Sequence, residues 1–219
     1  MQRPWVRMTT LFLLVSVAAA GWAQRALTVG AGVWRATMDH NWEGVSVDPA
    51  MLFGPVVQVN LNQVMVRSSF YMGQFAAQSE NGPADQTEVK RSDLSVSFGL
   101  PILRYGTVFA EYKKVKSSVE ATQKTAQDSA MEWSNGYIGA GGSAKVPIAG
   151  LPLFVCGSLT FLASSHIDVP DMQIVTLGLD FLPWQSVTIS VGYKMDIVGM
   201  KTGEKKIHGM MATATYTIR

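Results

Sequence analysis

The chain has 219 residues, of which 47% are hydrophobic and 16% are charged. After the N-terminus, no apolar run approaches the roughly 18–20 residues of a membrane-spanning helix, which excludes a helical membrane protein. Without Arg3 and Arg7, Lys and Arg fall from 18 to 16 and equal the 16 Asp and Glu. A neutral chain lacks the basic surface that binds nucleic acid, so no nucleic-acid partner is predicted.

The N-terminal segment has the three parts of a secretory signal. Two arginines form a basic start, residues 11–20 form an apolar core, and Gly21-Trp22-Ala23 forms a cleavage site. We therefore predict a cleaved signal peptide over residues 1–23, followed by a single mature domain over residues 24–219.

The rest of the chain alternates apolar residues with small or polar ones. This period of two predicts β-strands. In chain order the alternating segments cover residues 26–38, 51–62, 64–78, a segment ending at 100, 104–116, 137–146, 153–161, 173–181, 187–194 and 206–219.

The clearest example is the hairpin over residues 173–194, in which Pro183 marks the break. One face of its first strand is apolar, and the other carries Thr176, Gly178 and Asp180. Small residues with an occasional charge suit the crowded interior of a narrow barrel whose apolar face is turned to lipid. The alternative is a secreted soluble barrel that binds a small ligand, with its apolar faces pointing inward.

The breaks between segments are of two kinds, and the two kinds alternate strictly along the chain. The short breaks, mostly marked by Pro, lie near Asn62, Pro101, 147–152 and Pro183. The long polar breaks are 39–50, 79–87, 118–133, 164–171 and 199–205. Long loops at one end and short turns at the other predict an all-β, antiparallel up-and-down transmembrane barrel. We count ten strands, or eight if two less regular segments merge or lie outside the wall.

The mature chain resembles the small outer-membrane β-barrel superfamily, which includes opacity-type and OmpW-like porin-like proteins. The resemblance rests on the signal, the alternation, the loop asymmetry and the last strand, Gly209 to Arg219. In that superfamily the last strand ends on an aromatic residue that the barrel-assembly machinery recognises. Here the aromatic residue is Tyr216 and the chain ends at Arg219.

The resemblance implies an integral protein of a Gram-negative-type cell outer membrane, without enzymatic activity. It would act as a narrow porin-like channel or as a surface-exposed scaffold whose extracellular loops contact external partners. The implied partners are outer-membrane lipid, the barrel-assembly machinery and external ligands at the loops 39–50, 79–87, 118–133, 164–171 and 199–205.

Charged residues fall on the face predicted to line the lumen. They are Arg67, Arg91, Asp93, Glu111, Lys113, Lys145, Asp180, Lys194 and Asp196. Charges inside a narrow barrel must be paired or hydrated. We interpret them as an ion-pair network that knits the lumen together; the alternative is the lining of a narrow polar path.

Aromatic residues recur near the predicted strand ends, where rings commonly lie at the level of lipid headgroups. At the turn end they are Phe98, Tyr105, Phe181, Trp184 and Tyr216, and toward the loops they are Phe70, Tyr112, Phe161 and Tyr193. The alternative role, stacking against a ligand, is weaker because the rings fall at both rims.

No catalytic residues, cofactor or metal site are predicted. His40, His166 and His208 do not share the spacing of a metal site. The segment from Ser164 to Asp168 places a hydroxyl, an imidazole and a carboxylate in one loop, which is the basis of an alternative function as an outer-membrane lipid hydrolase.

Overall fold

The structure is a computed structural model that describes residues 25–39, 45–61, 63–79, 87–121, 131–166, 169–200 and 203–218. The predicted signal peptide, residues 1–23, lies outside the described residues. Within the described part of the chain, no helix is long and apolar enough to cross a membrane.

Every element is a β-strand, as the alternation predicts, because β-branched and aromatic residues at every second position pack well on a pleated surface. The strands are β1 (Arg25–Asp39), β2 (Val45–Val47), β3 (Ala50–Leu61), β4 (Val64–Ser79), β5 (Thr87–Leu103), β6 (Gly106–Ala121), β7 (Met131–Pro147), β8 (Leu153–Ser164), β9 (Met172–Trp184), β10 (Val187–Met200) and β11 (Gly203–Ile218).

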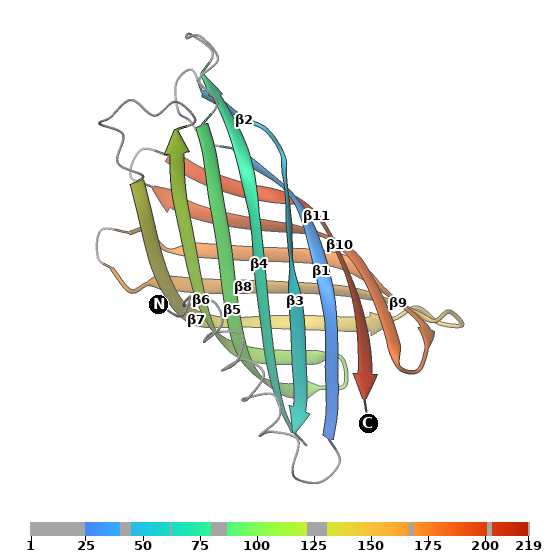
Figure 1. Cartoon of the computed structure of the whole chain (residues 1–219). Coiled ribbons are helices and arrows are strands. Elements are labelled where there is room, and N and C mark those ends of the chain that lie inside the picture. The colour runs from blue at the N-terminus through green and yellow to red at the C-terminus, as the bar shows by residue number, and fades with distance from the viewer. Residues whose placement is uncertain are drawn as a thin grey trace, which may run out of the picture.

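Ten of these strands close into one antiparallel barrel (Figure 1). Each long strand pairs with the next one along the chain, and β1 closes the wall by pairing with both β3 and β11. The closing ladder runs from Leu27 opposite Ile218 to Asp39 opposite Lys206. The predicted count of ten is confirmed, and the alternative of eight is wrong.

The short strand β2 was not predicted, and it lies within the segment 39–50 that we expected to be a loop. It pairs with the end of β4, with Val45 opposite Ser79. Pro49 has no N–H to donate and lies between β2 and β3, where it interrupts what would otherwise be one long strand.

The connections differ between the two ends of the barrel, as the sequence predicts. One end of the barrel holds the start of β1 and the end of β11 and is here called the turn end. Two-residue connections at this end join β3 to β4, β5 to β6 and β9 to β10. Figure 1 shows the start of β1 and the end of β11 together at this end. The other end, here called the loop end, carries the connections 40–44, 80–86, 122–130 and 165–171.

The predicted loop 199–205 is wrong. Strand β10 continues to Met200, β11 begins at Gly203, and these two residues pair. Residues 199–200 and 203–205, which we expected in this loop, extend the two strands, and residues 201–202 lie outside the described part of the chain. The segment 118–133 is shortened in the same way, because β6 continues to Ala121 and β7 begins at Met131.

Two prolines that we expected in turns lie instead within strands. Pro101 is in β5 and Pro183 is in β9, each close to the turn that follows. The ladder shifts register next to both of them, between Pro101 and Leu103 and between Val187 and Ile189. A residue without an N–H is tolerated in a strand where the ladder is already irregular.

The two faces of the wall differ in polarity. The outward face carries large apolar side chains, and Ile138 and Leu177 are 65% and 63% exposed. Buried apolar side chains inside the lumen form two clusters on different parts of the wall. The core of this protein is therefore the inside of its barrel.

Candidate functional site

Five charged residues meet inside the barrel and are here called the charge cluster: Arg91 and Asp93 on β5, Lys113 on β6, and Lys194 and Asp196 on β10. Strands β6 and β10 are separated by β7, β8 and β9 in the wall. An ion pair between β6 and β10 therefore crosses the lumen instead of following the wall.

The contacts within the charge cluster are short. The Arg91 guanidinium donates two hydrogen bonds to the Asp93 carboxylate, Nε to Oδ1 at 2.7 Å and Nη2 to Oδ2 at 2.8 Å. The Lys113 ammonium donates across the lumen to Oδ2 of Asp196 at 2.5 Å and lies 3.5 Å from Oδ2 of Asp93. Lys113 thus links the two carboxylates.

Water is excluded from the centre of this cluster. The side chains of Lys113 and Asp196 are 0% exposed, and that of Asp93 is 3% exposed. Charges withdrawn from water are stabilised only when they are paired with good geometry. Removal of Lys113 would take away the cation that Asp93 and Asp196 share, and would leave Asp196 with the more distant Arg91 and Lys194, each 3.5 Å away.

Aromatic side chains enclose the remaining cation of the cluster. The Nζ atom of Lys194 lies 4.1 Å from the centroid of the Trp34 ring and 6.0 Å from that of Tyr71. Tyr71 crosses the lumen, because its hydroxyl lies 3.9 Å from Sδ of Met211 on β11. Gly32 allows this crossing, since a Cβ at that position would collide with the Tyr71 hydroxyl.

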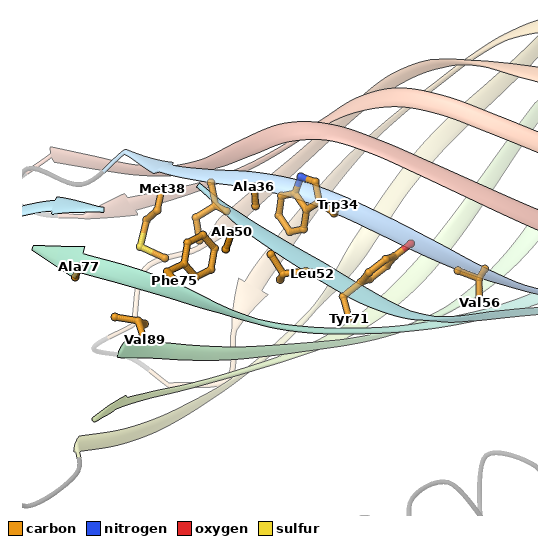
Figure 2. Packing of buried hydrophobic residues seen from close by; sticks show 11 residues of the cluster. Trp34, Ala36, Met38, Ala50, Leu52, Val56, Tyr71, Phe75, Ala77 and Val89 are labelled. Carbon is orange, nitrogen blue, oxygen red and sulfur yellow. The ribbon is translucent and has the colours of Figure 1, made fainter. Parts of the chain in front are cut away.

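Apolar side chains fill the lumen toward the loop end (Figure 2). Trp34 and Leu52 are 0% exposed, and Phe75 and Ile207 are 1% exposed. They come from β1, β3, β4 and β11. A second apolar cluster, formed by Val115, Tyr137, Leu162, Met172 and Ile174, fills the other side of the barrel. Together with the charge cluster, these residues close the lumen.

Sequence reasoning missed this apolar filling, although a signal for it was present. We expected the inward face to consist mostly of Gly, Ser and Thr with an occasional charge. Leu52 lies two residues before Gly54 and therefore shares its inward face. Phe75 lies two residues after Gly73 and shares its inward face in the same way. Extending each alternation to the end of its strand would have predicted a closed loop end.

The half of the lumen toward the turn end contains a cavity of about 170 Å³ with a mixed lining. Five serines and two threonines line part of it, Met65, Phe109 and Ile174 line another part, and Arg67 and Glu111 lie on its wall. It extends to Tyr71, Thr160 and Lys194, where the closed part of the lumen begins. Among the described residues, no ion pair joins Arg67 or Glu111 to another side chain.

The nine predicted lumen charges therefore lie in three places. Five form the charge cluster, and Arg67 and Glu111 line the cavity. Lys145 and Asp180 form a separate pair with Nζ 2.7 Å from Oδ2, and the Lys145 side chain is 43% exposed.

A hydrogen-bonded chain that we did not predict lies on the outward face near the loop end. Oη of Tyr193 lies 2.5 Å from Nδ1 of His208, and Nε2 of His208 lies 2.9 Å from Oδ2 of Asp39. The three residues lie on adjacent strands β10, β11 and β1. The sequence gives no spacing for such a chain, because Asp39 and His208 meet only when the barrel closes.

The proposed hydrolase loop has a different arrangement from that of a catalytic triad. Oγ of Ser164 accepts a hydrogen bond from the main-chain N–H of His166 at 3.2 Å. The N–H of Ser164 donates to Oδ1 of Asp171 at 3.1 Å. The hydroxyl thus bonds to the backbone of its own loop, and Asp168 lies outside the described residues.

The aromatic residues predicted for the turn end lie on the outward face. Trp184 is 70% exposed, and the set comprises Phe98, Tyr105, Phe181, Trp184 and Tyr216. Arg104 lies over the ring of Tyr105, with Cζ 5.2 Å from its centroid. In the described part of the chain, no group of His, Cys, Asp and Glu could hold a metal ion.

No protein-family model matches this chain, and no curated protein matches it. Several solved structures of outer-membrane barrels are similar to it. The translocator domain of the autotransporter NalP from Neisseria meningitidis is 10% identical, with 96% of this chain and 94% of that chain covered and a TM-score of 0.47.

The attachment invasion locus protein Ail of Yersinia pestis is 11% identical, with 89% of this chain and 97% of that chain covered and a TM-score of 0.44. The outer membrane protease OmpT from Escherichia coli is 11% identical, with 90% and 97% covered and a TM-score of 0.48. The chain is an all-β protein with a closed ten-stranded antiparallel barrel, and its structural neighbours are small outer-membrane barrels.

Proposed function

We propose that this protein is an integral outer-membrane barrel with a closed lumen, which acts as a scaffold presenting its loop end to partners outside the cell. The signal at residues 1–23 would direct its export, and the turn end would face the periplasm. The observation that carries this proposal is the complete burial of Lys113 and Asp196 across the lumen.

The outward face supports a place in the membrane. Large apolar side chains such as Phe53, Ile138 and Leu177 are more than half exposed there. Exposure of apolar surface to water costs roughly 25 cal/mol of free energy for every Å². A continuous apolar surface of this kind therefore marks a contact with lipid or protein. The outward aromatic residues at the turn end fit the interface between lipid and water.

The closure of the wall fits assembly by the barrel-assembly machinery. Tyr216, the last aromatic residue, is paired on both sides, with Val29 on β1 and Val187 on β10. The last strand is therefore the one that seals the barrel, and a machinery that recognises it would act on the closing step.

The lumen supports a scaffold over a channel. A hydrated ion that enters through the cavity meets Tyr71 and Lys194, and then the other members of the charge cluster. Passage would require Lys113 to separate from Asp196, and breaking a buried ion pair costs about 3–5 kcal/mol. The apolar side chains of Trp34, Leu52 and Phe75 would have to move as well.

The loop end supports contact with external partners. Strands β5 and β6 continue past their apolar part and carry Lys90, Lys114 and Lys116 on the outward face. The predicted loops 79–87 and 118–133 connect these extended strands to their neighbours. Partners would meet this rim, which stands beyond the level of the apolar side chains.

Proteoliposome swelling tests the proposal. Liposomes that contain the refolded protein should swell no faster in small sugars or amino acids than empty liposomes do. A Trp34→Gly/Phe75→Gly variant, which removes two large side chains from the lumen, should swell faster. A Lys145→Ala variant, in which the change lies outside the closed part, should behave as the unchanged protein does. Solute uptake by the unchanged protein would overturn the scaffold in favour of a narrow porin-like channel.

A further inference from the structure

A groove of about 810 Å³ lies on the outside of the barrel across β3, β4, β5 and β6. Its lining residues Met72, Lys90 and Lys116 point outward. Along their strands they alternate with the buried, inward-pointing residues Tyr71, Arg91 and Lys113. Its volume lies within the roughly 300–1,000 Å³ that is common for small-molecule sites.

The groove has an apolar part and a basic part. Met51, Phe53 and Met72 line the apolar part and are 46%, 55% and 47% exposed. Lys90, Ser92 and Lys116 line the basic part. The ladder joins the two parts, since Met72 is opposite Ser92 and Ser92 is opposite Lys116.

The groove lies where the outward face changes from apolar to polar. On β4 the change occurs between Met72 and Gln74, and on β5 it occurs between Leu94 and Ser92. In a barrel that spans the membrane with its loop end outside, this level is that of the headgroups of the outer leaflet. An occupant would therefore have its apolar part toward the turn end and its polar part toward the loop end.

We propose that this groove binds a phosphorylated lipid of the outer leaflet. The acyl chain lies on Met51, Phe53 and Met72, and the phosphate receives hydrogen bonds from Lys90 and Lys116. The proposal rests on the outer-membrane placement proposed above and names a partner for the outward face of the scaffold.

The charges of the groove select the occupant. A phosphate close to an ammonium group forms a charge-assisted hydrogen bond, which is about twice as strong as a neutral one. Lys90 and Lys116 also interact with other groups of the chain. An ammonium has three donors, so binding of a phosphate does not require these side chains to be free. A zwitterionic lipid brings its own cation to the site and would bind less well.

The test is native mass spectrometry of the folded protein in detergent, titrated with diphosphorylated lipid A, with lipid A from which both phosphates are removed, and with phosphatidylethanolamine. We expect the unchanged protein to bind the diphosphorylated lipid at least about tenfold more tightly than the other two, a difference of about 1.4 kcal/mol. The Lys90→Gln/Lys116→Gln variant should lose this preference.

The matched control is Lys206→Gln, which removes an outward lysine of β11 that lies outside the groove. It should bind the diphosphorylated lipid as the unchanged protein does. Slower migration after boiling in a detergent gel checks that each variant is folded. Equal binding by the double variant, or an equal loss in the control, would overturn the proposal.

The same preparations separate this proposal from the one on which it rests. Release of the protein from membranes by carbonate without detergent would contradict the proposal that it is an integral outer-membrane protein. If the protein stays in the membrane but its Lys90→Gln/Lys116→Gln variant still binds phosphorylated lipid, only the proposal that the groove is the binding site would be contradicted.

Discussion

Replacement of Lys113 by Met tests whether the cross-lumen ion pair holds the barrel together. Met keeps an unbranched side chain of similar length but removes the ammonium that lies 2.5 Å from Asp196 and 3.5 Å from Asp93. Loss of one partner of an isolated buried pair costs about 3–5 kcal/mol. Arg91 and Lys194 remain 3.5 Å from Asp196 in the variant, so the loss should lie toward the lower end of this range. The free energy of unfolding should fall by this amount, a large part of the typical 5–15 kcal/mol.

Lys145→Met is the matched control, since it removes a lumen lysine that is paired with Asp180 but is 43% exposed. An exposed pair contributes about 0–1 kcal/mol. The assay is urea unfolding in detergent micelles, followed by tryptophan fluorescence. Equal losses in the two variants would refute the reasoning that burial makes the first pair costly to break.

Three further predictions follow from individual contacts. Gly32→Val should destabilise the barrel by about 1–3 kcal/mol and displace Tyr71, because a Cβ there collides with its hydroxyl; an unchanged unfolding midpoint would contradict this close approach. His208→Gln should cost no more than about 1 kcal/mol, because the chain with Tyr193 is exposed; a loss above about 3 kcal/mol in the same urea assay would mean that it holds the barrel seam. His166→Ala should leave any hydrolysis of p-nitrophenyl esters unchanged, since Oγ of Ser164 bonds to the backbone; loss of a measurable activity would restore the hydrolase.

The sequence predicted the wall of this barrel well, because each strand carries its own signal. The alternation of Thr176, Gly178 and Asp180 with apolar residues depends only on neighbours along one strand. The strand limits were harder to predict. Polar residues such as those at 199–205 suit both a loop and a strand that extends into water, and only their pairing with the next strand distinguishes the two.

The inside of the barrel was predicted in part. The alternation of side chains along each strand predicted which of them point inward. It could not predict which side chains they meet across the lumen. Lys113 meets Asp196 because the strand number and the stagger of the ladder set the width of the barrel and the heights of facing residues. The same applies to Asp39 and His208, which are distant in sequence and meet only at the closing ladder.

Planar-bilayer conductance of the refolded protein tests the closed lumen most directly. With its lumen side chains unchanged, the protein should give no single-channel steps at any salt concentration. The Trp34→Gly/Phe75→Gly variant should give steps, which would show that the protein is inserted and that its lumen is blocked by side chains. Steady, ion-selective steps from the unchanged protein would contradict the account.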